Sequence, residues 1–388
     1  MGATLEPVYL IDGCRSPIGR GHPEKGIYRD LRADELAVQT LQALLGRHNL
    51  DPADIDDFYL GCVGQHLEQG KNLARLILLL SGLPVTIPGV TINRLCASSL
   101  TALQLGADTI RTGANRLLLA GGVEHLGHVS MTAALDYHPG LFEGAPYQWT
   151  NMGLTAEQLA AEYGISRREQ DEYTALSNQR HFQAVEAGKP AGELAPIALP
   201  DGTVVTADQE PRLSSPETLA GLPPVFQEGG TVTAANASGV SDGAVMALIG
   251  NETTLDQMAR TPLAEIGAAA TVGLPPEQMG LGPVPAINRL LDKTGLSIDQ
   301  IDLFEINEAF AVQVLACQRE LGIPTDRLNL YGGAVALGHP LGMSGLRIAL
   351  RLAYIMAERD ARRGIAALCV GHGQGVALLL ERTARCRN

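Results

Sequence analysis

Residues 50–59 read LDPADIDDFY, and residues 296–305 read LSIDQIDLFE, which is a related pattern at an offset of 246 positions. The segments LLLAG at 117–121 and ALCVG at 367–371 recur at a similar offset of 250 positions. A near-constant offset predicts two similar halves. Units of strand, helix and strand favour parallel strands with right-handed crossovers, so we expect a duplicated α/β fold.

The run NRLCASS at 93–99 places Cys96 between an apolar strand pattern at 90–92 and an amphipathic helix pattern at 100–110. Free N–H groups and the helix dipole at a helix N-terminus favour an anion. We therefore expect the Cys96 thiol to ionise more readily than a free thiol. The position has two interpretations, a sulfur nucleophile and a buried structural cysteine.

Two glycine-rich runs stand in the second half. YGGAVALGHPLGMSG at 331–345 contains His339, whose imidazole is suited to exchange protons near neutral pH. ALCVGHGQG at 367–375 contains Cys369 at the end of an apolar strand, beside a turn that can offer backbone N–H donors. Each run alone is also compatible with an ordinary turn or a core cysteine. Duplicated halves place equivalent loops together, so we expect these groups and Cys96 to meet.

These three runs, with NEAF at 307–310, resemble the motifs of the thiolase family in order and spacing over essentially the whole chain. The resemblance implies duplicated βαβαβαββ halves that form two five-stranded sheets in α-β-α-β-α layers, with an inserted loop domain. It implies that Cys96 is the nucleophile and becomes acylated. His339 would be its base and would donate to the thioester oxygen, and Cys369 would be the second acid and base.

The same resemblance implies supporting groups. His339 and a water held by Asn307 would stabilise the enolate, and the backbone N–H groups of Cys96 and Gly371 would hold the acyl oxyanion. Coenzyme A enters as a substrate, and no permanently bound cofactor is expected. Four residues are implied to contact coenzyme A: Ser238 in the run NASG, Met152, Phe310 and, across a one-residue gap, Arg212.

The chain is divided into three domains by this interpretation. A loop domain that covers the site and holds coenzyme A is inserted into the first half, which is therefore discontinuous. Two capping boxes, Thr155–Gln158 and Ser166–Glu169, indicate helix starts in the insertion. The predicted domains are 1–125 plus 241–262 for the first half, 126–240 for the loop domain and 263–388 for the second half.

Composition excludes other classes of protein. A net charge of −13 disfavours nucleic acid and anionic membranes as partners. Six cysteines without a paired framework or C-x-x-C favour a reducing, cytoplasmic setting. We expect no secretion signal and no transmembrane segment. His125 and His128 have the spacing of a shared helix face, with Glu124 before them, but no third ligand is evident, so we expect no metal site.

Loop segments at 61–70, 123–128 and 136–140 are similar to those of the degradative bacterial thiolases that form the β-subunit of the fatty-acid-oxidation complex. This implies cleavage of 3-ketoacyl-CoA in β-oxidation, a homodimer or homotetramer, and a hydratase/dehydrogenase α-subunit as a candidate partner. The alternatives are a biosynthetic acetoacetyl-CoA thiolase and, more distantly, a non-catalytic binding subunit of a lipid complex. A cysteine hydrolase would need no second cysteine. His372 is given no catalytic role.

Overall fold

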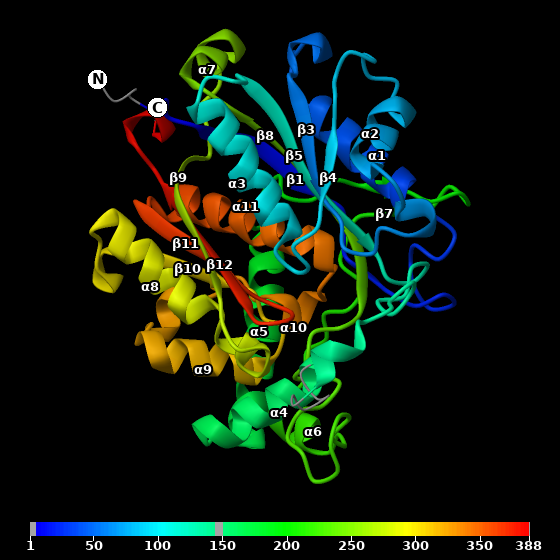
Figure 1. Ribbon diagram of the computed structural model, residues 1–388, viewed down its shortest axis with the longest axis vertical. Helices are drawn as coiled ribbons and strands as arrows, with labels where there is room; N and C mark the ends of the chain where they lie inside the picture. Colours follow the sequence, from blue (N-terminus) through cyan, green and yellow to red (C-terminus); the bar gives the residue numbers. More distant parts are fainter. Residues whose placement is uncertain (1–4, 144–149, 388) are drawn as a thin grey trace.

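The computed structural model describes residues 5–143 and 150–387 and shows an α/β protein built on one long mixed sheet (Figure 1). The strand order is β10-β11-β12-β9-β1-β8-β5-β3-β4, and β2 is attached to β8. The first half contains β1 (Tyr9–Arg15), β2 (Gly19–Arg20), β3 (Asp57–Gly61), β4 (Val90–Ile92), β5 (Leu117–His125) and β8 (Ser241–Gly250). The second half contains β9 (Ala264–Gly273), β10 (Leu303–Ile306), β11 (Arg363–Val370) and β12 (Gln374–Glu381).

The two halves repeat one strand order. The first runs β4-β3-β5-β8-β1, and the second runs β10-β11-β12-β9, with a single bridge from Leu328 to Phe304 in the place of β4. The halves meet where Tyr9 and Leu10 of β1 pair with β9. The duplicated α/β fold is confirmed, and this short antiparallel ladder joins the two expected sheets at one edge.

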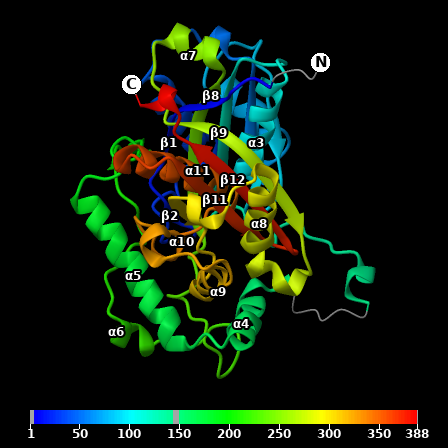
Figure 2. The same cartoon turned by 90° about the vertical axis from the view of Figure 1, so that its left-hand side faces the viewer.

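Layers of helix and sheet alternate through the molecule (Figures 1 and 2). Helices α3 and α11 share one apolar core with the inner faces of both halves of the sheet. Helices α1 and α2 pack on the outer face of the first half, and α8 and α9 on that of the second. The expected α-β-α-β-α arrangement therefore forms, because each sheet face must bury its apolar side chains. These helices are α1 (Ala33–Leu45), α2 (Leu73–Leu80), α3 (Ser98–Arg111), α8 (Pro283–Thr294), α9 (Ala311–Leu321) and α11 (Leu341–Arg359).

The chain between β5 and β8 forms a separate group of helices below the sheet in Figure 1. Asn151 Oδ1 accepts hydrogen bonds from the N–H groups of Gly153 and Leu154, so the first of these helices begins one turn before Thr155. The predicted capping box at Thr155–Gln158 is therefore wrong, whereas the one at Ser166–Glu169 is confirmed. The elements of this segment are α4 (Met152–Tyr163), α5 (Arg167–Glu186), β6 (Ile197–Ala198), β7 (Val204–Val205) and α6 (Pro216–Ala220). Two shorter helices lie in the halves themselves: α7 (Glu252–Met258) and α10 (Ala334–Leu337).

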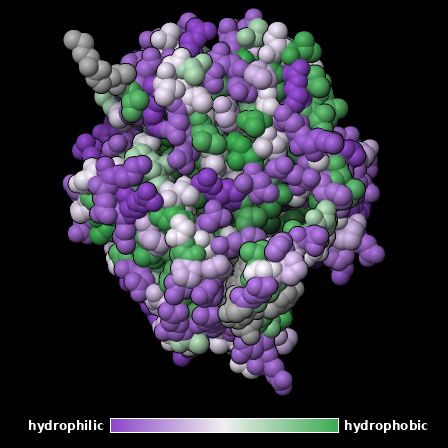
Figure 3. Space-filling model, in the orientation of Figure 1, coloured by the Kyte–Doolittle hydropathy of each residue, from purple (hydrophilic) through white to green (hydrophobic). Residues whose placement is uncertain are grey.

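Exposed apolar side chains gather on α2, on the loop after it and on the edge strand β4. Hydrophobic residues gather at this upper right-hand side of the molecule in Figure 3. Across the described ranges, no helix is both long and apolar enough to cross a bilayer. The exposed group consists of Leu76, Leu79, Leu80, Val85 and Val90.

Candidate active site

The turn before α3 is closed by its own polar side chains. Asn93 Oδ1 accepts from the N–H of Leu95 at 2.8 Å, and Ser98 Oγ accepts from the N–H of Arg94 at 2.9 Å. The Ser98 hydroxyl also donates to the Leu95 carbonyl at 2.6 Å, and Leu95 adopts a left-handed φ of 46°. Cys96 is thus held in a fixed, half-buried turn, two residues before the first residue of α3.

The Cys96 thiol does not ionise as easily as expected. Burial raises its pKa to about 11 and outweighs the backbone N–H groups of Gly371 and of Cys96 itself, which act in the opposite direction. The expectation of a lowered pKa is wrong, because the thiolate loses more hydration than the nearby N–H groups restore. Cys96 therefore rests as a thiol and requires a base for activation.

The hairpin of β11 and β12 brings the second thiol to the first. Cys369 pairs with Gly375 across this hairpin and is 2% exposed. Burial raises the pKa of Cys369 well above its ordinary value, and the Cys96 thiol raises it further. Gly371, just beyond β11, directs its N–H at the Cys96 sulfur. Cys96 and the run that contains Cys369 and Gly371 thus come from two distant parts of the sequence to one place.

His339 lies in the loop between α10 and α11 and is 6% exposed. Its Nδ1 is 2.6 Å from Ser344 Oγ, and the Ser344 hydroxyl donates to the Pro340 carbonyl at 2.8 Å. Because that hydroxyl has only one hydrogen, His339 must donate from Nδ1 and carry its lone pair on Nε2. Burial, and then the charge of Arg347, lower the pKa of His339 to about 3. The imidazole is therefore neutral and can accept a proton on Nε2.

Asn307 is buried directly after β10, where its N–H donates to the Ala367 carbonyl of β11 at 2.9 Å. Its Nδ2 is 3.4 Å from His339 Nε2, and its Oδ1 accepts from Arg347 Nη2 at 3.4 Å. The structure thus places Asn307 beside His339. Sequence reasoning missed Arg347, although it interrupts an otherwise apolar helix pattern together with Arg351 four residues on.

The N-termini of α3 and α11 pack against each other, and this contact draws the loops of Cys96 and His339 to the same end of the molecule. Ser99 Oγ accepts from the N–H of Leu346 at 2.9 Å. Gly345 faces Leu100 so closely that an added Cβ would lie 2.7 Å from the Leu100 nitrogen. The two equivalent helices of the halves therefore set the spacing of the loops before them.

The residues expected to contact coenzyme A adjoin these loops. The N–H of Ser238 donates to the Ala309 carbonyl at 2.9 Å, beside the buried Phe310. The Gly239 carbonyl accepts from the N–H of His339 at 3.1 Å. A Cβ built on Gly371 would lie 3.7 Å from Met152 Sδ, so Met152 borders the turn after β11.

A groove of about 370 Å³ extends from the inserted segment toward these residues. Its walls include Glu210 and Arg212 of the inserted segment, together with Ala237, Gly239 and Gly338, the chain neighbours of Ser238 and His339. Arg212 is exposed, and its backbone N–H donates to Asn178 Oδ1 at 3.1 Å. It therefore lies on the groove as an exposed residue of the inserted segment.

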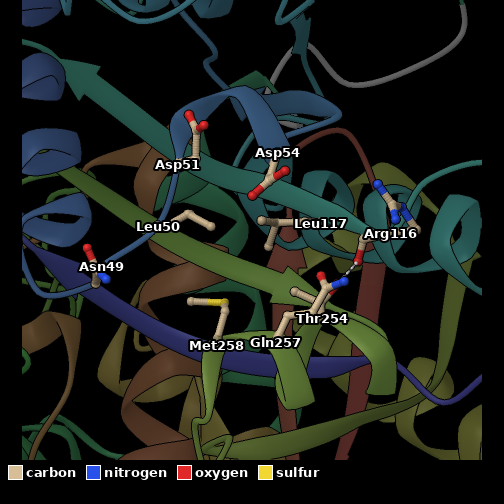
Figure 4. A pocket seen from close by; sticks show the side chains of 9 residues that line it. All are labelled: Asn49, Leu50, Asp51, Asp54, Arg116, Leu117, Thr254, Gln257 and Met258. Carbon is tan, nitrogen blue, oxygen red and sulfur yellow. Dashed lines mark hydrogen bonds between the residues drawn. The ribbon is translucent and has the colours of Figure 1, made fainter.

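A smaller cavity of about 90 Å³ lies between the loop after α1 and helix α7 (Figure 4). Its lining contains no cysteine or histidine, so it does not offer the chemistry of a thiol site. Its residues are Asn49, Leu50, Asp51, Asp54, Arg116, Leu117, Thr254, Gln257 and Met258.

His125 and His128 do not share a helix face, because His125 ends β5 and His128 lies in the turn after it. Their rings stack at 3.9 Å, and Glu68 supplies the third group that the sequence did not reveal. His128 Nδ1 bonds to Glu68 at 3.0 Å and its Nε2 to the Arg29 carbonyl at 2.8 Å. His125 Nε2 faces two backbone carbonyls, and its Nδ1 accepts from the N–H of His128. Hydrogen bonding accounts for this cluster.

His372 follows Gly371 with a left-handed φ of 63°. Its Nε2 is 3.1 Å from the hydroxyl of Tyr137 in the inserted segment, and the two rings meet edge to face. The turn after Gly371 is therefore tied to the inserted segment, and no catalytic role follows from this contact.

Known proteins share both the sequence and the architecture. Residues 8–253 match the thiolase N-terminal domain, and residues 260–382 match the thiolase C-terminal domain. The 3-ketoacyl-CoA thiolase of Cronobacter sakazakii is 44% identical over 389 residues, which cover 97% of this chain and 100% of that protein. The 3-ketoacyl-CoA thiolase of Vibrio vulnificus is 43% identical, with the same coverage.

Solved structures agree with this similarity. Human mitochondrial 3-ketoacyl-CoA thiolase superimposes with a TM-score of 0.89 at 36% identity, over 98% of this chain and 100% of that one. The dimeric peroxisomal thiolase of Saccharomyces cerevisiae superimposes with a TM-score of 0.90 at 35% identity, over 97% of this chain and 98% of that one.

Proposed function

The chain belongs to the thiolase family, and from that premise we propose that Cys96, His339 and Cys369 carry out its acyl transfer. It is an acyltransferase of the 3-ketoacyl-CoA thiolase type, which cleaves a 3-ketoacyl-CoA with CoA to acetyl-CoA and a shortened acyl-CoA. The observation that carries the residue assignment is the meeting of two thiols and the Gly371 N–H at one place.

The first half-reaction acylates Cys96. His339 Nε2 takes the proton of the Cys96 thiol, and the thiolate attacks the 3-keto carbon. The N–H groups of Cys96 and Gly371 hold the resulting oxyanion. The C2–C3 bond then breaks, which leaves an acyl-cysteine and the enolate of acetyl-CoA. Protonated His339 and a water held by Asn307 donate to the enolate oxygen, and Cys369 gives its proton to the enolate carbon.

The second half-reaction transfers the protons in the opposite direction. The Cys369 thiolate takes the proton of the incoming CoA thiol, and the CoA sulfur attacks the thioester carbonyl. The same two N–H groups hold the tetrahedral oxyanion. Cys96 leaves as a thiolate and recovers its proton from His339. These steps use CoA only as a substrate, so no resident cofactor is needed.

The CoA molecule is assigned to the groove that begins at Arg212. Ser238 and Met152 would contact the pantetheine arm near the thiols, with Phe310 packed against the loop of Ser238. The continuity of the groove walls with the loops of Ser238 and His339 supports this path. A solved human relative that shares 36% identity is described in complex with CoA, which agrees with a CoA site in this fold.

We also propose the division into domains at 1–125 plus 241–262, 126–240 and 263–388. The helices of the middle segment, which interrupt the first half between β5 and β8, support it. A cytoplasmic location follows from a mechanism that requires two reduced thiols.

At least a homodimer is proposed, with α2 and β4 in the interface. β4 leaves an unpaired edge, and the apolar side chains beside it are exposed. The yeast relative is described as dimeric. A hydratase/dehydrogenase α-subunit stays a candidate partner, from the resemblance of the loop segments alone.

Peptide mapping tests the chemistry. The protein is incubated with an acyl-CoA donor, quenched in acid and digested, and the added acyl mass is expected on the peptide of Cys96. A thioester on another residue, or full activity in Cys96→Ser, would overturn the assignment.

Cleavage rates on 3-ketoacyl-CoA chains of four to sixteen carbons then separate the degradative type from an acetoacetyl-CoA thiolase. We expect medium or long chains to be preferred. A preference of about tenfold for acetoacetyl-CoA, about 1.4 kcal/mol in transition-state binding, would favour the biosynthetic type.

A further inference from the structure

Arg347 is a buried cation beside the proposed site. It lies on α11 and is 1% exposed. Two of its guanidinium nitrogens, Nε and Nη1, have no hydrogen-bond partner among the described residues, and Nη2 donates to Asn307 Oδ1. Glu305, two residues before Asn307, likewise leaves its buried Oε1 without a partner. An arginine that is buried with so few partners destabilises the fold unless other interactions offset its lost hydration.

The charged groups around Arg347 are engaged with one another. Arg351, one turn further along α11, forms two hydrogen bonds with the Glu193 carboxylate, at 2.7 and 2.8 Å. Glu193 also pairs with Arg15 of β1. Glu305 of β10 contributes a carboxyl whose pKa burial raises to about 8. Among the described residues Arg347 therefore forms no ion pair; its Nη2 bonds to Asn307, and its charge lowers the pKa of His339.

The chemistry of these groups allows only one orientation of the amide. Arginine has donors and no acceptor, so the atom of Asn307 that faces Arg347 must be Oδ1. The Asn307 NH₂ group then faces His339 Nε2, which is an acceptor because Nδ1–H donates to Ser344. The donors therefore run in one direction, from Arg347 through Asn307 to His339.

We propose that Arg347 is a positioning residue that holds the Asn307 amide with its NH₂ group toward His339 Nε2, where it can hold the water that donates to the enolate oxygen. This inference rests on the proposed function of Cys96, His339 and Asn307. Without the donor at Oδ1, the amide can rotate by half a turn and present its own oxygen to the lone pair of His339 Nε2. Two acceptors would then face each other, and the water that donates to the enolate oxygen would lose the NH₂ group that holds it.

The effect of an Arg347 variant on Asn307 can be separated from a general loss of structure, because enolate formation and alkylation of Cys96 use different groups. Enolate formation requires the NH₂ group of Asn307, whereas alkylation of Cys96 by iodoacetamide does not. Hydrogen–deuterium exchange at the α-carbon of acetyl-CoA measures the first step, and the rate of alkylation measures the second. A general loss of structure would lower both.

The test compares Arg347→Met, which removes the donor, with Arg347→Gln, which retains an amide donor of shorter reach. We expect Arg347→Met to lower α-carbon exchange by about 100-fold while alkylation of Cys96 at a fixed pH of 10 stays within about threefold of the wild type. Arg347→Gln should recover part of the exchange. Circular dichroism and thermal unfolding of both variants establish that the fold is intact.

A double-mutant cycle gives the decisive outcome. In an Asn307→Ala background, Arg347→Met should add less than about threefold to the loss of exchange, because its effect is transmitted through the absent amide. Equal losses in both backgrounds, or wild-type exchange in Arg347→Met, would overturn the proposal. Failure of the proposed function has a different signature, namely no α-carbon exchange in the wild-type protein.

Discussion

The carboxylate of Glu124 on β5 accepts a hydrogen bond of 2.8 Å from the backbone N–H of Gly342, in the first turn of α11. The same carboxylate accepts from the two N–H groups of residues 63–64 and from the Gln69 side chain. One buried acid of the first half therefore holds the start of the helix that follows His339 in the second half.

Replacement of Glu124 tests this connection. Glu124→Gln puts an NH₂ group where four donors converge, so at least one donor loses its acceptor. We expect a loss of about 1–3 kcal/mol in the free energy of unfolding and lower thiolysis, measured by urea denaturation and by the consumption of free CoA thiol. The exposed Glu186→Gln on α5 is the control and should match the wild type. An unchanged unfolding midpoint in Glu124→Gln would show that the contact does not stabilise the fold.

The pH dependence of Cys96 reactivity follows from its raised pKa. Below a pKa of about 11 the thiolate fraction rises about tenfold per pH unit, so alkylation of the free protein should increase steadily from pH 7 to 10. A neutral His339, whose pKa is lowered to about 3, cannot form an imidazolium partner in that range. Mass spectrometry of the Cys96 peptide measures the rate. A plateau above pH 7 would instead indicate an ionised thiol.

Close backbone packing of the two halves makes Gly122 sensitive to substitution. A Cβ on Gly122 of β5 would lie 2.3 Å from the Gly342 carbonyl oxygen, which is backbone and cannot rotate away. We expect Gly122→Ala to cost about 1–3 kcal/mol in unfolding free energy by overpacking. Gly273→Ala, at the open end of β9 where a Cβ meets no atom within 4 Å, is the matched control. Equal stabilities of the two variants would contradict the prediction.

The Glu193 carboxylate makes the free energy of unfolding depend on pH in the acidic range. Its contacts with Arg351 and Arg15 lower its pKa to about 2. A carboxyl with a lowered folded-state pKa stabilises the fold above its ordinary pKa, and this contribution is lost as the pH falls from about 4.5 to about 2. We expect Glu193→Gln to lose about 3–5 kcal/mol at pH 7, because it leaves the buried Arg351 without its carboxylate, whereas Arg15 keeps Asp208. Urea titrations should show the difference in unfolding free energy between Glu193→Gln and the wild type becoming smaller below pH 4. A difference that does not change with pH would show that it does not come from the Glu193 charge.

The assembly prediction is tested by placing a charge in the exposed apolar group. Leu80→Glu, at a side chain 58% exposed, should shift dimer dissociation by more than about tenfold because it buries an unpaired carboxylate at the interface. Val185→Glu, at a side chain 55% exposed on α5, is the matched control. Light scattering over a dilution series measures both. A wild-type protein that is monomeric at all concentrations would refute the interface.

The positions of the thiols and the imidazole could be predicted from the sequence because each lies in a short, locally defined run. Cys96 precedes a helix pattern, Cys369 ends an apolar strand, and His339 is enclosed by glycine and proline. The near-constant offset between the halves then predicted that their loops would meet. The roles of these residues stay predictions until the labelling and exchange experiments are done.

Other features could not be predicted from the sequence. The capping box at Thr155 was wrong because Asn151, four residues earlier, offers its oxygen to two N–H groups. The stacked pair of His125 and His128 depends on Glu68 from a distant loop. A local pattern does not reveal which of several competing caps or partners a folded chain will use.

The sequence by itself determined the duplicated α/β architecture, the family and the order of the reactive runs, because these depend on local patterns and their spacing. Only the tertiary structure decided the electrostatics of the site. Burial raised the pKa of Cys96 where the helix start alone predicted a lower one, and packing of α11 placed Arg347 behind Asn307. The free energy of a charge depends on all the atoms that replace its water, and those atoms come from segments hundreds of residues apart.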